Sequence, residues 1–340
     1  MRKRLVIIVV LVLLCGLGIL LYEFFVPGRA GGEVVVEIPE RATFDQIVQR
    51  LDDADLIGSS AAFRLLAATT GNDARIKPGV YRFPRGIPAA ELLNALAEGR
   101  STVRVKVTFP EGATIERIAS IAAGRAGVDS AELVELATDR SFLRSIDVDA
   151  ATAEGCLMPD TYYLYWGERP QTLLSRMAEL HRKFYTGALK ARSSAIGLTP
   201  YQVLILASIV EGEAHVAEER PVVAGVYLNR LKKGMKLQAD PTLQYAVPGA
   251  PRRLLNSDLQ LDSPYNTYRY SGLPPTPINN PGRASIKAVL ESERHDYLYF
   301  VARADGSGRH IFSRNSAEHS KAVRDYRLRV AQQREKMKAN

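Results

Sequence analysis

The sequence predicts an α+β protein that is carried on a single N-terminal transmembrane helix. Three observations support this class: an apolar run opens the chain, a strand-and-helix unit occurs twice in the first third, and short strands are interspersed with helices in the rest. With 340 residues the chain is long enough for two or three domains, and 46% hydrophobic with 24% charged residues is typical of a globular protein.

Residues 5–25 form the apolar run, and three basic residues at positions 2–4 precede it. The run has about the length of a helix that crosses a bilayer core. Because the basic residues precede it, residues 1–4 are expected in the cytoplasm and the rest of the chain outside the cytoplasmic membrane. A cleaved signal peptide is the alternative, but its apolar region is usually shorter, and no A-x-A site follows this run. Residues 26–32 form a short Pro/Gly linker.

The charge and the cysteines exclude some classes of protein. The formal net charge is +8, and +5 remains without the three N-terminal basic residues. That charge is too mild and too scattered for nucleic-acid binding, and it suits anionic lipid headgroups and anionic cell-wall polymers equally well. Cys15 lies in the apolar run and Cys156 beyond it, so no intrachain disulfide is expected.

A repeated unit organises the first third of the chain. Residues 38–47 recur as residues 109–118, each copy following a valine-rich strand and opening an amphipathic helix. The threonine of each copy is a natural N-cap, and Thr43 forms a capping box with Gln46. Between the copies, the sequence predicts helices at 61–70 and 88–98 around a strand in the segment KPGVYRFP. The block is therefore a small α/β module.

Residues 127–197 are predicted to be mostly helical, with an interruption at EGCLMPDTYYLYWG, residues 154–167. This segment is rich in aromatic residues. The aromatic residues are Tyr162, Tyr163, Tyr165 and Trp166. Their side chains form either a platform on which sugars stack or part of a core or domain seam.

The segment ASIVEGEA places two acids, Glu211 and Glu213, at the end of an apolar helix. Thr199 is placed as its N-cap, with Pro200 at the first helical position and Gln202 completing a capping box. An acid on the last turn of a buried helix is partly desolvated, which raises its pKa and keeps it protonated near neutral pH, as a general acid requires.

Helical phase separates the two acids. Glu213 continues the apolar stripe of the helix, whereas Glu211 lies above Ser208. We therefore expect Glu213 to be the proton donor and Glu211 to belong to a polar network that orients it. Both acids would enter one cleft only if the helix ended between them, at Gly212. The alternative is that both are solvated acids at a helix terminus.

The C-terminal part continues with a second helix starting near Pro221 and then the segment LQADPTLQYA. Residues 263–282 are rich in Pro, Gly, Asn and Tyr, and the tyrosines favour an ordered loop. A helix at 283–292 precedes strands at 297–303 and 310–313, which a turn joins as a hairpin. Asn315 with Glu318 then caps a long, charged terminal helix.

These motifs together resemble the endolytic murein transglycosylases of the MltG (YceG-like) family. The resemblance covers nearly the whole chain, from the membrane segment through KPGVYRFP, ASIVEGEA, YLNRL, MKLQADPT and SPYNTYRYSGLPPTPINNPG to YLYFVARADGSGRHIFSRNSAEH. It implies one or more LysM-like modules in residues 33–125 and a larger mixed α/β catalytic domain in residues 126–340. Family members commonly have Thr or Ser after the catalytic acid; here Ala214 stands there.

The resemblance also implies an activity: cleavage of the MurNAc–GlcNAc β-1,4 bond within glycan strands to leave 1,6-anhydro-MurNAc ends, with Glu213 as general acid and base. Glu211 is the runner-up or orienting acid. Because Glu211, Asp240 and Asp262 are possible second carboxylates, a peptidoglycan hydrolase stays open. The residues expected to bind the substrate are Gln238, Asp240, Tyr265, Asn266, Thr267, Tyr268 and Asn229.

No cofactor or metal is expected, because the five histidines form no H-E-x-x-H or comparable spacing and no phosphate loop or dinucleotide fingerprint is present. The implied partners are peptidoglycan glycan strands, the cytoplasmic membrane and peptidoglycan synthases, with cleavage terminating nascent strands. The alternative from another class is a non-catalytic, membrane-tethered cell-wall binding or scaffold protein.

Overall fold

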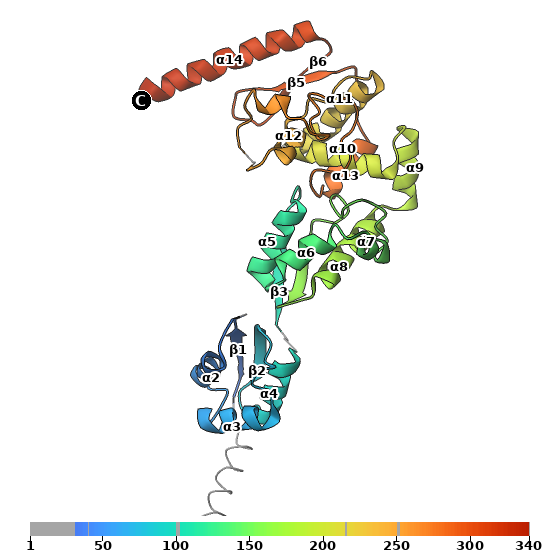
Figure 1. The fold of residues 1–340 in the computed structure, drawn as a ribbon. Helices are drawn as coiled ribbons and strands as arrows, with labels where there is room; N and C mark the ends of the chain where they lie inside the picture. The colour runs from blue at the N-terminus through green and yellow to red at the C-terminus, as the bar shows by residue number, and fades with distance from the viewer. Residues whose placement is uncertain (1–30, 40, 100–102, 215, 250–251, 340) are drawn as a thin grey trace, which may run out of the picture. The chain divides into compact units, whose positions relative to one another are not determined.

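The computed structural model of the chain describes residues 31–339, except residues 40, 100–102, 215 and 250–251 (Figure 1). The predicted cytoplasmic tail and transmembrane helix, residues 1–4 and 5–25, lie outside the described residues, as does most of the linker. Within the described ranges, no single helix is long and apolar enough to cross a membrane. One bent pair, Leu189–Ala195 with Pro200–Glu213, meets those length and composition limits together.

The described residues mix helices with three two-stranded sheets, which confirms the mixed helix-and-strand class. They fall into two compact units. The first contains the described residues up to Val107 together with Ile121–Asp129 and Tyr162–Arg169, and the second contains Thr108–Ser120, Ser130–Thr161 and the chain from Pro170 onward.

The first unit is built on strand β1 (Glu33–Ile38), which pairs antiparallel with β2 (Gly79–Pro84). Helices α2 (Phe44–Asp53) and α3 (Ser60–Thr70) connect the two strands, and α4 (Ala89–Glu98) follows them. All five elements lie where the sequence predicts them. One apolar cluster fills the space between the sheet and the helices, and its members include Ile38, Leu51, Phe63, Tyr81 and Leu92.

The second copy of the repeat also has its predicted form. Strand β3 (Arg104–Thr108) precedes helix α5 (Ile115–Ala126). The Arg117 N–H donates to Oγ1 of Thr114 over 3.3 Å, just as the Gln46 N–H donates to Thr43 in the first copy. Both threonines therefore cap their helices, as expected.

Strand β3 pairs with β4 (Thr161–Tyr165), which lies inside the aromatic segment predicted to interrupt the helices. Tyr162 of that segment is buried, whereas Tyr163 and Tyr165 are exposed. Tyr162 therefore packs in the core, which was one of the two predicted alternatives, whereas Tyr163 and Tyr165 do not.

Helix α10 (Pro200–Glu213) is the centre of the second unit, and it packs against α11 (Arg220–Lys232) and α13 (Arg283–Leu290). Its start confirms the prediction: Thr199 and Gln202 form the complete capping box. The residues of its body, 203–210, are all buried. Helices α9 (Gly187–Ala195) and α12 (Asp240–Ala246) also contact α10. The other helices of the unit are α6 (Ser130–Leu136), α7 (Arg140–Ser145) and α8 (Pro170–Phe184), and α6 packs against α8.

The end of α10 corrects one expectation. The helix does not stop at Gly212, because the Ala214 N–H still donates to the Val210 carbonyl over 3.0 Å. Gly212 serves close packing instead: a Cβ placed there would lie 2.7 Å from Cβ of Pro241. Glu211 and Glu213 therefore keep their helical separation of about 200° and point in different directions.

The C-terminal elements are the predicted hairpin and terminal helix. Strands β5 (Tyr299–Ala302) and β6 (His310–Ser313) pair antiparallel, and α14 (Ser316–Ala339) packs against both of them (Figure 1). The Glu318 N–H donates to Oδ1 of Asn315 over 2.9 Å, which confirms the predicted cap. The loop of residues 263–282 is held by specific side-chain hydrogen bonds, such as that between Tyr265 and Thr276, in agreement with the predicted ordered loop.

Candidate active site

A cavity of about 370 Å³ opens beside the C-terminal end of α10, within the second unit. Helices α10 and α11, the start of α12, the loop of residues 263–282, strand β5 and helix α14 each contribute to its wall. The residues that line it are Glu213, Tyr227, Arg230, Gln238, Asp240, Tyr268, Tyr299, Phe300 and His319.

Among the residues that line the cavity, Glu213 has a carboxyl whose pKa is shifted to near neutral pH. Burial raises the pKa of its carboxyl to about 7. A hydrogen bond from the Tyr227 hydroxyl to Oε1, 2.9 Å long, opposes that effect. The negative charge of Asp240 raises the pKa further, and the positive charge of Arg230 lowers it. The carboxyl is therefore substantially protonated at neutral pH and can give up its proton there.

Tyr227 and Arg230 lie three residues apart on α11, so they share one face of that helix. The Arg230 guanidinium donates to two backbone carbonyls, from Nε to Leu298 over 2.7 Å and from Nη1 to Leu237 over 2.5 Å. Arg230 is only 7% exposed, so the cavity contains a buried positive charge that neutral carbonyls hold in place.

Asp240 is the first residue of α12, and Gln238 lies two residues before it. The Tyr268 hydroxyl donates to Oδ1 of Asp240. Gln238 has a left-handed backbone with φ of 48°, which is unusual for a side chain of this kind. The Gln238 N–H donates to the Thr267 carbonyl over 3.1 Å, and this bond holds the strained residue at the cavity wall.

Of the predicted site residues, the structure brings four together in the cavity: Glu213, Gln238, Asp240 and Tyr268. The other four predicted substrate-binding residues do not line it. Asn229 donates to the carbonyls of His295 and Tyr297, at 2.7 and 3.1 Å, so it secures the chain that leads into the hairpin. Its role in substrate binding stays a prediction.

The remaining three belong to the loop of residues 263–282 and shape it from within. Tyr265 shares a 2.8 Å hydrogen bond with Thr276. Asn266 is completely buried and donates to the carbonyls of Leu259 and Leu261. Thr267 accepts from the Ala239 N–H over 3.0 Å. These contacts position Tyr268 and Gln238, and any direct contact of the three with substrate stays a prediction.

Glu211 lies in a polar network, as expected, but away from the cavity wall. Its Oε2 accepts from the Gly282 N–H over 2.9 Å, and its Oε1 accepts from Arg220 over 3.3 Å. Arg220 also lies 3.9 Å from the carboxylate of Glu111. Glu211 thus fastens the end of the 263–282 loop to α10, and any orienting effect on Glu213 passes through the helix.

Five cavity residues were missed by sequence reasoning: Tyr227, Arg230, Tyr299, Phe300 and His319. The motif YLNRL lies in the right segment, but its asparagine, Asn229, was the residue predicted to bind substrate, whereas its tyrosine and arginine line the cavity. A tyrosine and an arginine three apart, following the apolar residues 222–226 of the same helix, were the available signal. Tyr299 and Phe300 carried no local signal, because the packing of the hairpin brings them to the cavity.

The β5–β6 hairpin is tied to the turn that follows α10, the 3₁₀ helix Ala217–Glu219. The Glu219 carboxylate accepts from the His310 N–H over 3.0 Å and lies 2.7 Å from Nδ1 of the same histidine. The ring of Phe300 then packs edge-on against Tyr227, with centroids 5.9 Å apart. The hairpin thereby supports the tyrosine that holds Glu213.

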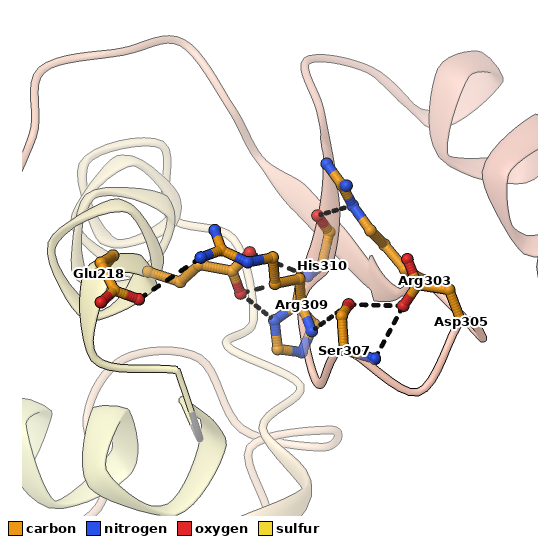
Figure 2. A network of polar contacts seen from close by, with 7 residues as sticks. Glu218, Arg303, Asp305, Ser307, Arg309 and His310 are labelled. Carbon is orange, nitrogen blue, oxygen red and sulfur yellow. Dashed lines mark hydrogen bonds and ion pairs between the residues drawn. The ribbon is translucent and has the colours of Figure 1, made fainter.

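Figure 2 shows how the hairpin turn reinforces this attachment. Glu218 pairs with Arg309 over 3.6 Å, and Nε of Arg303 donates to the His310 carbonyl over 3.3 Å. The Ser307 hydroxyl donates to Oδ1 of Asp305 and closes the turn. These contacts fasten the hairpin turn to the 3₁₀ helix that follows α10.

The cavity thus combines a partly protonated carboxyl, a second carboxyl, a buried cation, and tyrosine hydroxyls that can bind sugar hydroxyls. This set suits acid–base chemistry on a polar, uncharged bond. Among the residues described, no group of three or more His, Cys, Asp and Glu could hold a metal ion.

Comparison with known proteins adds independent information. The profile of the YceG-like family matches residues 36–325. An endolytic murein transglycosylase of Bacillus subtilis (strain 168) is 31% identical over 310 residues, which cover 86% of this chain and 84% of the relative. An endolytic murein transglycosylase of Streptococcus pneumoniae (strain R6) is 28% identical over 326 residues, and the match covers 58% of that longer protein. The crystal structure of a YceG-like protein from Listeria monocytogenes is similar, with a TM-score of 0.60 and 28% identity, and the match covers 85% of this chain and 98% of that one.

Proposed function

The chain belongs to the YceG-like family, and we propose that it is an endolytic murein transglycosylase. Its reaction cleaves the MurNAc–GlcNAc β-1,4 bond within glycan strands and leaves 1,6-anhydro-MurNAc ends. The observation that carries this proposal is Glu213: a carboxyl at the wall of an open cavity, with its pKa raised by burial to about 7. The two relatives named above as endolytic murein transglycosylases match over most of this chain.

One carboxyl is sufficient for this reaction. Because Tyr227 donates to Oε1 of Glu213, we place the acidic proton on Oε2. That proton passes to the glycosidic oxygen as its bond to C1 breaks. The C6 hydroxyl of the same sugar then attacks C1 and returns its proton to the carboxylate. No water is consumed, and Glu213 ends in the protonation state in which it began.

The other polar groups of the cavity would bind and orient the sugars. Gln238, Asp240 and Tyr268 line the wall beside Glu213 and are proposed to contact hydroxyl and acetamido groups. The loop residues Tyr265, Asn266 and Thr267, together with Asn229, would keep that wall in position. Glu211 would act as a structural anchor and not as the proton donor.

A hydrolase is the second candidate, because Asp240 places another carboxyl in the same cavity. Hydrolytic glycosidases use two carboxylic groups, one of which activates water or attacks the sugar. In that case the product would have a reducing end in place of an anhydro ring.

We further propose that residues 5–25 form a transmembrane helix that anchors the protein in the cytoplasmic membrane, with residues 1–4 in the cytoplasm and the catalytic domain outside. The apolar run and the basic residues before it support this topology. Residues 26–32 would be the linker, residues 33–125 the LysM-like region and residues 126–340 the catalytic domain. Two helices between the paired strands β1 and β2 support a LysM-like region. Peptidoglycan synthases are the proposed protein partners.

The decisive experiment is mass spectrometry of purified, uncleaved glycan strands after incubation with the protein or with its Glu213→Gln variant. Anhydro-ended fragments from the unaltered protein alone would support the transglycosylase and its acid together. Reducing ends would identify the hydrolase, and strands that are bound but intact would identify the scaffold protein.

A further inference from the structure

Strand β4 presents two aromatic rings to solvent. Its alternate residues face opposite sides: Tyr162 and Leu164 are 6% and 0% exposed, whereas Tyr163 and Tyr165 are 55% and 40% exposed. The buried pair supplies the apolar packing of the strand, so the core does not require aromatic residues on the other side. Two large exposed rings side by side on one strand are typical of a binding surface.

The neighbouring strand adds positive charge to the same face. Nη2 of Arg104 donates to the Tyr165 hydroxyl over 2.8 Å, and the guanidinium lies 4.9 Å from the centroid of the Tyr165 ring. Thr108 and Thr161 share a 2.9 Å hydrogen bond farther along the strands. Residue 104 thus meets residue 165 and residue 108 meets residue 161, so β3 and β4 are antiparallel.

With this register, Lys106 lies opposite Tyr163, and it is exposed like Arg104. Two tyrosines and two cations therefore share one solvent-facing side of the β3–β4 sheet. The nearby carboxylate of Glu168 accepts from the Tyr165 backbone N–H over 3.0 Å, at the end of the strand. One acid against two basic side chains leaves the face positive.

We propose that Arg104, Lys106, Tyr163 and Tyr165 form a second glycan-binding surface, which holds the murein strand through sugar rings and stem peptides that do not react. The apolar faces of sugar rings would stack on the tyrosines, and the carboxylates of the stem peptides would pair with the cations. None of the four residues lines the cavity of Glu213. The proposal rests on the proposed function for the identity of its ligand.

The chemistry of the four side chains favours a glycan over a lipid surface. Surfaces that insert into a bilayer interface present Trp, Phe or Leu beside their basic residues. Here the exposed rings both carry hydroxyls, and the Tyr165 hydroxyl is held in a hydrogen bond with Arg104. Tyrosine offers both a ring face for stacking and a polar edge for sugar hydroxyls.

The test uses the full chain in a Glu213→Gln background, so that the strands are bound and not consumed. Co-sedimentation with purified, insoluble murein would compare Tyr163→Thr/Tyr165→Thr with Tyr163→Phe/Tyr165→Phe. Threonine retains the preference for a strand but removes the ring, and we expect about a tenfold weaker binding. Phenylalanine retains the ring and should bind within about twofold of the parent. An unchanged thermal midpoint would show that the sheet is intact.

A second measurement separates this surface from the catalytic site. With Glu213 present, the double Thr variant should cleave a short oligosaccharide at the parent rate but require a higher concentration of long strands for half-maximal rate. Equal binding of all variants to murein would overturn the proposal, as would a loss of binding to phosphatidylglycerol vesicles without any loss for murein. If the unaltered protein cleaves no strand while the double Thr variant still loses binding, the proposed activity fails and the surface stands.

Discussion

The Tyr227 hydroxyl donates to Oε1 of Glu213 across 2.9 Å, from a side chain that is itself 1% exposed. A buried tyrosine has little freedom to move, so the bond fixes one oxygen of the carboxyl. The same bond limits how far burial can raise the pKa of Glu213. One contact therefore sets both the direction of the acid and its strength.

Replacing Glu213 with Gln removes the acidic proton and keeps the shape of the side chain. We expect cleavage of glycan strands to fall by about 10²- to 10⁴-fold, the usual contribution of a general acid. Strand binding should persist, and sedimentation with murein would measure it. A variant that cleaves at the parent rate would show that another group supplies the proton.

Replacing Tyr227 with Phe removes the hydrogen bond to Oε1. Because that bond lowers the pKa of Glu213, its loss should raise the pKa above about 7 and move the alkaline limb of the pH–rate profile to higher pH. The maximal rate should nevertheless drop about tenfold, because the carboxyl is less well oriented. An alkaline limb at its original position would mean that Tyr227 does not contact the acid during catalysis.

Replacing Asp240 with Asn should move the same limb in the opposite direction. The Asp240 carboxylate raises the pKa of Glu213 by charge repulsion, so its removal lowers that pKa and shifts the loss of activity to lower pH. Profiles of the two variants measured side by side would show shifts of opposite sign. If Asp240→Asn abolishes cleavage at every pH, Asp240 instead takes part directly, as the hydrolase alternative requires.

Replacing Glu211 with Gln should affect stability more than chemistry. The Gly282 N–H and Arg220 both donate to this carboxylate, and an amide can accept from only one side. We expect a loss of about 1–3 kcal/mol in the free energy of unfolding, measured with urea. The alkaline limb of the rate profile should stay in place, in contrast to the variants at Tyr227 and Asp240.

Local signals made much of this fold predictable. The capping boxes at Thr43 and Thr199, the strand pattern of β1 and the turn of the β5–β6 hairpin all depend on neighbours in the chain. The position of Glu213 could also be predicted, because it depends on helical phase and on the apolar stripe of its own helix. The expectation that α10 could end at Gly212 was wrong. A glycine can either end a helix or allow close packing, and the close approach of Pro241 depends on a contact that is not local in the chain.

The rest of the site depends on contacts between distant segments. Phe300 reaches the cavity because Glu219 holds His310, a pairing across 91 positions of the chain. Asn229 was chosen in place of Arg230, since the motif alone does not say which face of α11 meets the cavity. The sequence therefore predicted Glu213 and three further residues that line the cavity, whereas the other lining residues reach it through long-range packing.

Glu154 connects three distant segments from a completely buried position and carries the last prediction. Its Oε1 accepts from Nδ2 of Asn280 over 2.7 Å, and its Oε2 accepts from the Ile115 N–H over 3.2 Å. Burial raises the pKa of this carboxyl from 4.5 to about 8, so the folded protein binds a proton that the unfolded chain has released near neutral pH. A raised pKa of this kind contributes stability that is fully present below pH 4.5 and is lost as the pH rises through about 8.

The Glu154→Gln variant should therefore change the pH dependence of folding. Its amide turns a donor towards either Asn280 or Ile115, so at about pH 5 it should be less stable than the parent by about 1–3 kcal/mol. By about pH 9 that deficit should shrink or reverse, because the parent must then bury a charge that the amide avoids. Urea unfolding followed by circular dichroism at both pH values measures the difference, with Glu213→Gln as the control for the raised carboxyl of the cavity. A deficit that stays constant with pH would show that Glu154 does not change protonation on folding.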